Sequence, residues 1–316
     1  MATTARGISL AEDHTYEQIL DALQALFGKH PGFRPVHAKG ILCKGRFTPT
    51  ASASAFCRAP HFQGHGVPIT VRFSDFTGIP AIADNDPNAS PRGLAVRFHL
   101  PAGVFTDVVA HSYNGFPAAT AGEFLQFLRA LIASGSGAVS PNPIETFLQD
   151  HPRAKEFVEN IKPIPESFAT ECYYAVDAFR FTNREGADRY GRLRFVPVAG
   201  KKYVGVPSAV LPANYLFDEL SQRIKQQPIE FLLVTQLAAA ADVINDASQP
   251  WPESRAQMNL GLLSITSLVP DSDAMQRSLC FDPANLVDGI EPSHDPLIQA
   301  RSRIYALSFK RRNAAQ

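Results

Sequence analysis

The chain has 316 residues, of which 45% are hydrophobic and 19% charged, a composition typical of a globular protein with a sizeable core. Lys and Arg number 30 and so do Asp and Glu, which argues against a general nucleic-acid binder. No apolar run approaches the ~20 residues that cross a bilayer, and the N-terminus lacks the apolar stretch of a secretory signal. We therefore expect a cytoplasmic protein without a membrane span or nucleic-acid partner, whose four separated cysteines are reduced.

The first half of the chain opens with a predicted helix and continues with strands. Residues 15–30 carry apolar side chains at helical spacing, and glycines and a proline end the pattern. Alternating apolar and polar residues indicate strands near 41–48, 69–74, 94–100 and 104–110. A helical stretch follows around 124–131, and short helices are expected between 144 and 160.

The second half returns to strands. Residues 171–182 and 190–197 predict a hairpin that turns around Asn183–Gly186. A helix at 214–226, strands at 230–237 and 260–268, and a Pro-rich and then helical, basic segment at 281–313 follow. Eight antiparallel strands can close into a barrel that holds its own side chains or one small ligand. We therefore predict an α+β fold, in which helices surround an antiparallel eight-stranded β-barrel, as a single domain over 1–316 with an N-terminal arm at 1–14.

Two local patterns carry candidate chemistry. His37 lies in a predicted loop between the first helix and the first strand, where it could be an acid/base group or only a capping or surface histidine. Arg301 and Tyr305 are spaced i, i+4, so they share one face of the last helix. Such a pair is either an ordinary aromatic–cation contact or an arginine that favours a phenolate, and a phenolate can ligate haem iron.

Three sequence blocks resemble the core of the haem catalases. FDPANLVDGIEPSHDPLIQAR, which ends at Arg301, resembles the run that leads into the arginine and axial tyrosine of that family. RPVHAKG resembles its distal-histidine motif, and VRFS followed by SPRGLAVRFH resembles its next strand pair. The order and separation of the blocks agree, and the resemblance runs from about residue 20 to 313. The chain is shorter than a full catalase, and in this it is similar to the small catalase-related haem peroxidases.

The resemblance implies a haem b site and a role for each matching position. His37 would be the distal acid/base group, Ser74 would orient it, and Tyr305 would be the axial iron ligand with Arg301 as its charge partner. The other implied haem contacts are the propionate-pairing Arg34, Arg72 and Arg312, the apolar Val36, and the aromatic Phe116 and Phe124. Arg311 is the adjacent alternative to Arg312.

One part of the predicted site departs from the family. Catalases carry a distal asparagine after a Val-Gly step, whereas this chain reads DVVAHSYNGF from Asp107. A gapless match puts His111 at the asparagine position, and Asn114 lies three residues later. We prefer Asn114 as the distal partner and keep His111 as the alternative.

The function implied is a peroxidase that reduces hydrogen peroxide or organic hydroperoxides with a small organic electron donor and protects against oxidative stress. A true catalase is one alternative, and a non-enzymatic haem carrier is another, although a carrier needs no distal acid/base. A fatty-acid hydroperoxide dehydratase or isomerase is the third, but Val36 stands where those enzymes carry threonine. The shortened ends predict a more open haem and a simpler assembly than the catalase tetramer, a homodimer.

Overall fold

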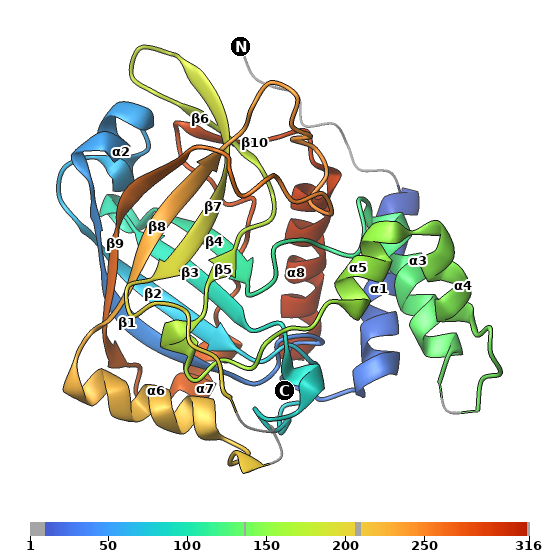
Figure 1. The fold of residues 1–316 in the computed structure, drawn as a ribbon. Coiled ribbons are helices and arrows are strands. Elements are labelled where there is room, and N and C mark those ends of the chain that lie inside the picture. The colour runs from blue at the N-terminus through green and yellow to red at the C-terminus, as the bar shows by residue number, and fades with distance from the viewer. Residues whose placement is uncertain (1–9, 136, 206–209, 315–316) are drawn as a thin grey trace.

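The computed structural model describes residues 10–135, 137–205 and 210–314. Eight strands close into an antiparallel barrel in the order β7-β5-β4-β3-β2-β1-β9-β8, and β8 pairs with β7 to complete the ring (Figure 1). They are β1 (Gly40–Pro49), β2 (Val67–Ser74), β3 (Gly93–His99), β4 (Phe105–His111), β5 (Tyr173–Tyr174), β7 (Asp188–Pro197), β8 (Ile229–Leu237) and β9 (Gln257–Leu268). The short strands β6 (Phe179–Thr182) and β10 (Ile290–Pro292) extend the sheet beyond β7. The predicted α+β fold with an eight-stranded barrel is confirmed.

The helices lie outside this barrel. They are α1 (Leu10–Phe27), α2 (Ala51–Phe56), α3 (Ala121–Ala133), α4 (Pro143–Asp150), α5 (Pro152–Glu159), α6 (Tyr215–Gln226), α7 (Ser272–Arg277) and α8 (Pro296–Ala314). Figure 1 shows α1, α3, α4 and α5 as a separate layer, with α8 between this layer and the barrel. Helix α8 contacts both α1 and α3, so it joins the two parts of the molecule.

Two predicted elements differ from the structure. Helix α1 begins at Leu10 rather than at residue 15, so residues 10–14 of the predicted arm are helical, and residues 1–9 lie outside the described residues. The strand predicted over 171–182 is broken into β5 and β6. Asp177 lies in this break, where its side chain forms an ion pair with Arg301 of α8.

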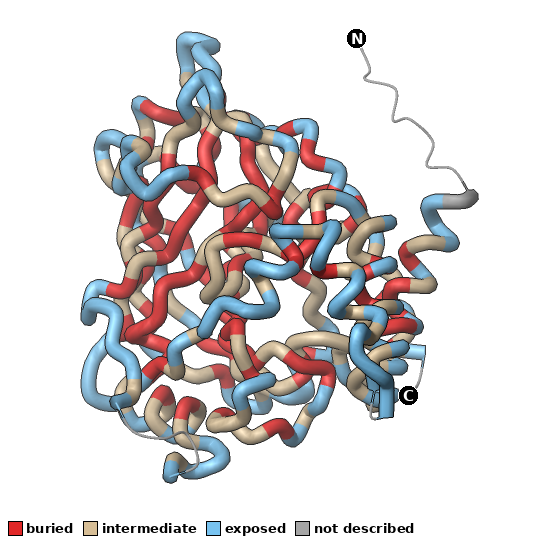
Figure 2. The backbone as a smooth tube through the Cα atoms, turned by 45° about the vertical axis from the view of Figure 1, so that its right-hand side comes forward, coloured by how far each residue is buried: buried red, intermediate tan, exposed pale blue. Residues whose placement is uncertain are grey.

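The interior of the barrel is filled with aromatic side chains. Phe47, Phe73, Phe98 and Phe231 are fully buried, and the rings of Phe47 and Phe98 meet edge to face at 5.2 Å. Figure 2 shows buried residues along the barrel strands and exposed residues mainly in the connecting loops and outer helices. The barrel therefore holds its own side chains, and a large ligand must bind outside it.

His61 is a titratable group within this aromatic core. It is 2% exposed, lies between the rings of Phe62 and Phe98, and its Nδ1 has no hydrogen-bond partner among the described residues. Burial lowers its pKa from 6.5 to about 3. The folded protein therefore keeps His61 neutral, whereas the unfolded chain protonates it below about pH 6.5.

We expect His61→Phe to make the protein less sensitive to acid. The pKa of His61 is lower in the folded protein than in the unfolded chain. The contribution of neutral His61 to the free energy of unfolding is therefore fully present above pH 6.5 and declines as the pH falls toward 3. Between pH 7.5 and 5.0 the wild type should lose about 2 kcal/mol more unfolding free energy than the variant. Urea unfolding at the two pH values measures this, with the exposed His65→Gln as control. Equal losses in wild type and His61→Phe would contradict the prediction.

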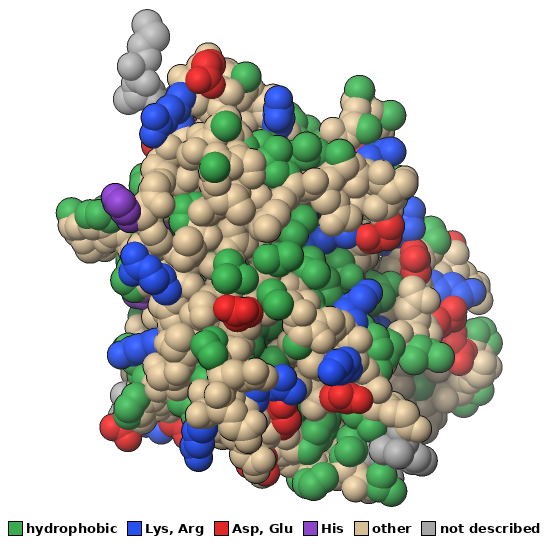
Figure 3. Space-filling view, turned by 60° about the vertical axis from the view of Figure 1, so that its left-hand side comes forward, with side chains coloured by type: hydrophobic (Ala, Val, Ile, Leu, Met, Phe, Trp, Pro, Cys, Tyr) green, Lys and Arg blue, Asp and Glu red, His purple; other side chains and the backbone are tan. Residues whose placement is uncertain are grey.

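The outer surface is mixed in charge. On the face shown in Figure 3, Lys and Arg side chains alternate with Asp and Glu and with scattered hydrophobic side chains. Among the described residues, every helix is too short or too polar to traverse a bilayer.

Candidate active site

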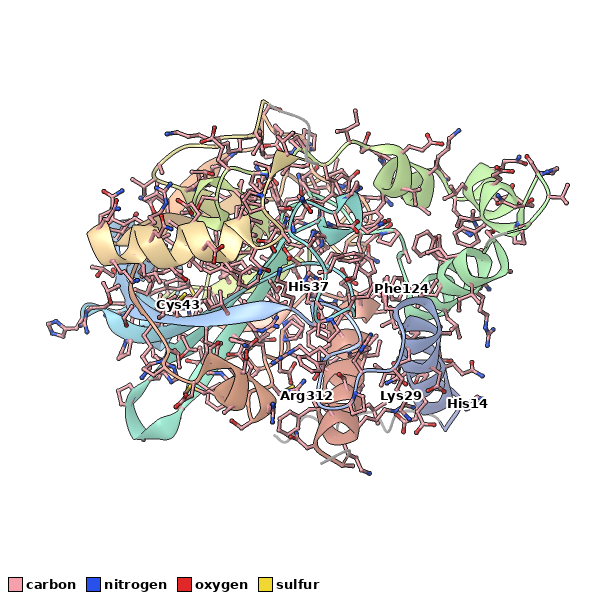
Figure 4. The ribbon with its side chains drawn as sticks, turned by 90° about the horizontal axis from the view of Figure 1, so that it is seen from below. His14, Lys29, His37, Cys43, Phe124 and Arg312 are labelled. Atoms are coloured by element: carbon pink, nitrogen blue, oxygen red, sulfur yellow. The ribbon has the colours of Figure 1, made fainter. Side chains whose placement is uncertain are left out.

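A cavity of about 870 Å³ lies between the outer face of β2–β4 and helices α1, α3 and α8. Its size and mainly apolar lining are typical of a site for a small molecule or cofactor. Figure 4 shows His37 and Phe124 on the barrel side and the helical side of this region. Of the residues predicted from the sequence, the cavity is lined by His37, Ser74, Arg34, Val36, Arg72, Phe116, Phe124, Arg301, Tyr305 and Arg312, together with the alternative residue His111.

His37 is held in the cavity wall by contacts on its backbone and on its ring. Its φ is 55°, a left-handed conformation that few residues besides glycine adopt, and histidine is one of those that tolerate it. The His37 N–H donates to the carbonyl oxygen of Phe76 at 2.6 Å, and an Arg72 N–H donates to the His37 carbonyl oxygen at 2.9 Å. Ser74 Oγ lies 3.1 Å from His37 Nδ1, so the pair predicted from the sequence forms a hydrogen bond.

The environment of His37 keeps its imidazole neutral. Burial, reinforced by the positive charge of Arg72, lowers its pKa from 6.5 to about 3. A neutral imidazole has one nitrogen free to accept a proton. In the tautomer whose Nδ1–H donates to Ser74 Oγ, Nε2 is the nitrogen that is free to accept a proton.

Gly93 is a functional position that sequence reasoning missed. It opens β3 and pairs with Ser74 across the sheet. A Cβ at this position would lie 2.7 Å from His37 Nδ1 and still closer to Ser74 Oγ. Only glycine leaves room for the His37–Ser74 hydrogen bond. The sequence signal for it was a glycine directly before the predicted strand at 94–100, since a glycine in a strand often marks the close approach of another chain segment.

We expect Gly93→Ala to displace the His37 ring and to lower the peroxide-dependent activity by about 10- to 100-fold, because acid/base catalysis requires the group within hydrogen-bond reach. Steady-state rates on the haem-loaded protein measure the loss. Gly205→Ala is the matched control, because its added methyl group meets nothing within 4 Å, its backbone needs no positive φ, and it lies outside the cavity lining. An unchanged rate in Gly93→Ala would show that the close packing around His37 is unimportant.

Tyr305 and Arg301 form the second group in the cavity. Nε and Nη2 of Arg301 donate to the Tyr305 hydroxyl oxygen at 3.3 and 3.2 Å, which the i, i+4 spacing predicted. Nη1 of Arg301 forms an ion pair with Asp177, a carboxylate that is 1% exposed. Burial alone would lower the pKa of Arg301, but Asp177 and Tyr305 raise it above its usual range. Arg301 is therefore a fixed cation that donates two hydrogen bonds to the Tyr305 hydroxyl oxygen.

Asp177 is the other residue missed by sequence reasoning. It lies 124 positions before Arg301 in the chain, in the break between β5 and β6, so no local pattern links the two. Its carboxylate orients the Arg301 guanidinium from the side away from the phenol.

Three buried arginines form a positive cluster in the cavity wall. Arg34, Arg72 and Arg312 donate only to carbonyl or amide oxygens, and none has a carboxylate partner within the described part of the chain. The acceptors belong to Gln276, Arg277 and Leu279 and, for Arg72, also to His37 and Ala38. Burial lowers the pKa of Arg34, and the positive charges of Arg72 and Arg312 lower it further. Burial, followed by the charge of Arg312, likewise lowers the pKa of Arg72 to about 9. Such a cluster is a site for a carboxylate-bearing ligand.

The structure does not bring Asn114 to the cavity. Its side-chain N–H donates to Glu253 at 3.1 Å, and it is absent from the cavity lining, whereas His111 lies in that lining. The cause is the length of β4, which stays paired with β3 as far as His111 and turns away only afterwards. The preference for Asn114 is corrected in favour of His111.

His111 offers the same kind of hydrogen-bond donor as an asparagine amide. Burial, followed by the charge of Arg301, lowers its pKa to about 3, so it is neutral. Its Nδ1 accepts the backbone N–H of Tyr113 at 3.3 Å, which leaves the proton on Nε2.

Aromatic and aliphatic side chains form the rest of the wall. The rings of Phe116 and Phe124 lie 5.2 Å apart, and Phe124 packs on Phe127 within α3 at 6.3 Å. Val36, directly before His37, packs with the same helical layer. A flat, apolar ligand with acidic substituents therefore fits the cavity, since its rings would meet these side chains and its carboxylates would meet the arginine cluster.

An antiparallel barrel that presents a histidine–serine pair and an arginine–tyrosine pair to one outer cavity is the architecture of the haem catalase class. Comparison with known proteins leads to the same class. The family model described as Catalase matches residues 1–315. The chain therefore belongs to the catalase family, whose members bind haem.

Relatives and solved structures support this assignment. The chain is 35% identical to a catalase-related peroxidase of Mycolicibacterium paratuberculosis, covering 94% of this chain and 95% of that one. It is 32% identical to a catalase-related peroxidase of Synechococcus elongatus, covering 94% and 88%. The fold is similar to that of catalase A from Saccharomyces cerevisiae, with a TM-score of 0.79 and 19% identity over 99% of this chain and 67% of that chain.

Proposed function

We propose that the protein is a haem b peroxidase that reduces hydrogen peroxide or an organic hydroperoxide at the expense of a small organic electron donor. The observation that carries the proposal is that His37 with Ser74 and Tyr305 with Arg301 line one cavity. The curated relatives named catalase-related peroxidase support the same activity. The homodimer, the cytoplasmic location and the single-domain organisation with its arm stay predictions.

The residues of the cavity fit a haem. Tyr305 would hold the iron through its phenolate oxygen, and Arg34, Arg72 and Arg312 would pair with the two propionates. Phe116, Phe124 and Val36 would contact the ring. When bound, a haem supplies an iron centre that exchanges electrons with peroxide and then with the donor.

His37 moves the proton in the peroxide step. Nε2 of the neutral imidazole can accept the proton of the bound hydroperoxide oxygen and return it to the departing oxygen, so that O–O cleavage releases water or an alcohol rather than an anion. Ser74 holds the ring in place through Nδ1. His111, with its proton on Nε2, would donate a hydrogen bond to the peroxide.

The electrostatics predict an activity that is insensitive to mild acid. His37 has its pKa lowered to about 3, so it remains an acceptor throughout pH 5–8. We expect the rate constant for the reaction with peroxide, measured by stopped-flow absorbance, to change less than about twofold over this range. A fall centred near pH 6.5, the ordinary value for histidine, would contradict this role of a buried, neutral imidazole.

The test of the proposed function compares the products of two competing reactions of peroxide, the oxidised donor and oxygen. Haem-loaded protein is mixed with hydrogen peroxide and 2-methoxyphenol, and dye formation and oxygen release are recorded together. Donor oxidation with little oxygen supports a peroxidase. Rapid oxygen release with negligible donor oxidation would reassign the protein as a catalase, in which a second peroxide replaces the donor.

A further inference from the structure

A second hollow, of about 400 Å³, adjoins the active-site cavity where α1 and α8 end. The two share four lining residues, Leu20, Pro35, Ser308 and Arg312. Figure 4 shows Lys29, which follows α1, and Arg312 of α8 on adjoining elements at this edge of the molecule. The hollow and the cavity therefore adjoin, and Arg312 of the arginine cluster lines both.

The hollow carries an excess of positive charge. Lys29, Arg311 and Arg312 line it, and its only acid among the described residues is Asp21, which is exposed and pairs with Arg311 at 2.6 Å. Arg312 donates to the carbonyl oxygen of Leu279 on the cavity side. With Arg311 paired to Asp21 and Arg312 assigned to the haem propionates, Lys29 is the cation of the hollow that is left for an anionic ligand.

Lys29 is not needed to complete the end of α1. His30 Nε2 already hydrogen-bonds the carbonyl oxygen of Phe27, the last residue of the helix, at 3.1 Å. Within the described chain the Lys29 ammonium has no hydrogen bond or ion pair, and the residue is exposed. It is therefore free to bind an anion that enters the hollow.

The wall of the hollow also presents an aromatic ring. Phe33 lines it and is 46% exposed, so its ring is accessible to a ligand. The neighbouring Pro31 and Pro35 continue this apolar wall and restrict the backbone. A flat ring that bears a negative charge fits both features, with the ring against Phe33 and the charge near Lys29.

We propose that this hollow binds the electron donor, and that the donor is a small aromatic compound with an anionic group, such as a phenol carboxylate. The inference rests on the proposed peroxidase function. Each donor would lose one electron and its phenolic proton and leave as a phenoxyl radical. Two donors supply the two electrons and two protons that convert one ROOH into ROH and H₂O.

The test uses ferulate and its methyl ester, which share the oxidisable phenol and differ in one negative charge. We expect Lys29→Glu to raise the KM for ferulate by about tenfold and that for methyl ferulate by less than about twofold. Isothermal titration without peroxide should show the same weakening of ferulate binding, independently of turnover. Lys225→Glu on α6 is the matched control, because it makes the same change in net charge on an exposed lysine of a different helix.

Two outcomes would overturn the inference while leaving the peroxidase intact. One is an unchanged KM and dissociation constant for ferulate in Lys29→Glu, and the other is an equal rise for ferulate and methyl ferulate. Failure of the wild type to oxidise ferulate, methyl ferulate and 2-methoxyphenol with peroxide would instead refute the proposed function itself.

Discussion

Tyr305→Phe should abolish most of the peroxidase activity, by at least about 100-fold, because it removes the phenolate oxygen that would ligate the iron. The same change leaves Nε and Nη2 of Arg301 without their acceptor, although its ion pair with Asp177 remains. The haem absorption spectrum should therefore change or disappear, since the metal loses a charged ligand. The measurement is the visible spectrum after loading, followed by the rate of donor oxidation.

Tyr215→Phe is the control for this experiment. It also deletes a tyrosine hydroxyl that makes a hydrogen bond, here to the carbonyl oxygen of Pro165 at 2.8 Å, but α6 lies away from the cavity. We expect it to retain the wild-type spectrum and rate. Each lost hydrogen bond costs about 1 kcal/mol of stability, so both variants should fold. A wild-type spectrum in Tyr305→Phe would show that another residue holds the iron.

His37→Asn has the second largest expected effect. Loss of a positioned acid/base group costs about 10²–10⁴-fold in rate, and we expect the reaction with peroxide to slow by this amount. Asparagine tolerates the left-handed backbone at φ 55°, so the variant should not lose activity through misfolding. Stopped-flow rates against peroxide concentration measure the effect, and the visible spectrum checks that haem is retained.

Ser74→Ala provides the graded comparison for His37→Asn. It keeps the imidazole but removes the hydroxyl that lies 3.1 Å from Nδ1, so a smaller loss, of about tenfold, is expected. A loss in Ser74→Ala as large as that in His37→Asn would mean that the serine does more than orient the ring. Equal rates for the wild type and His37→Asn would exclude His37 as the acid/base group.

The sequence predicted the barrel and most of the site because these features rest on local patterns. The alternation of apolar and polar residues predicted the eight strands of the barrel, and the i, i+4 spacing predicted the contact between Arg301 and Tyr305. The resemblance to catalases then named residues from Arg34 to Arg312 that line one cavity in the structure.

What the sequence could not show depends on contacts between distant segments. Asp177 meets Arg301 only because the strand after β5 breaks next to α8. Gly93 matters because the pairing of β2 with β3 places Ser74 opposite it, and a side chain at this position would collide with Ser74 and His37. Asn114 was preferred on residue type alone, whereas the register of β4 decides that His111 reaches the cavity.

The measurement that tests the account most directly is a titration of the haem-free protein with ferric haem, followed by absorption. We expect saturation at one haem per chain, with a high-spin ferric spectrum and with binding weakened when Arg34, Arg72 and Arg312 are replaced together by glutamine. No saturable uptake, or uptake indifferent to these arginines, would contradict the assignment of this cavity as the haem site.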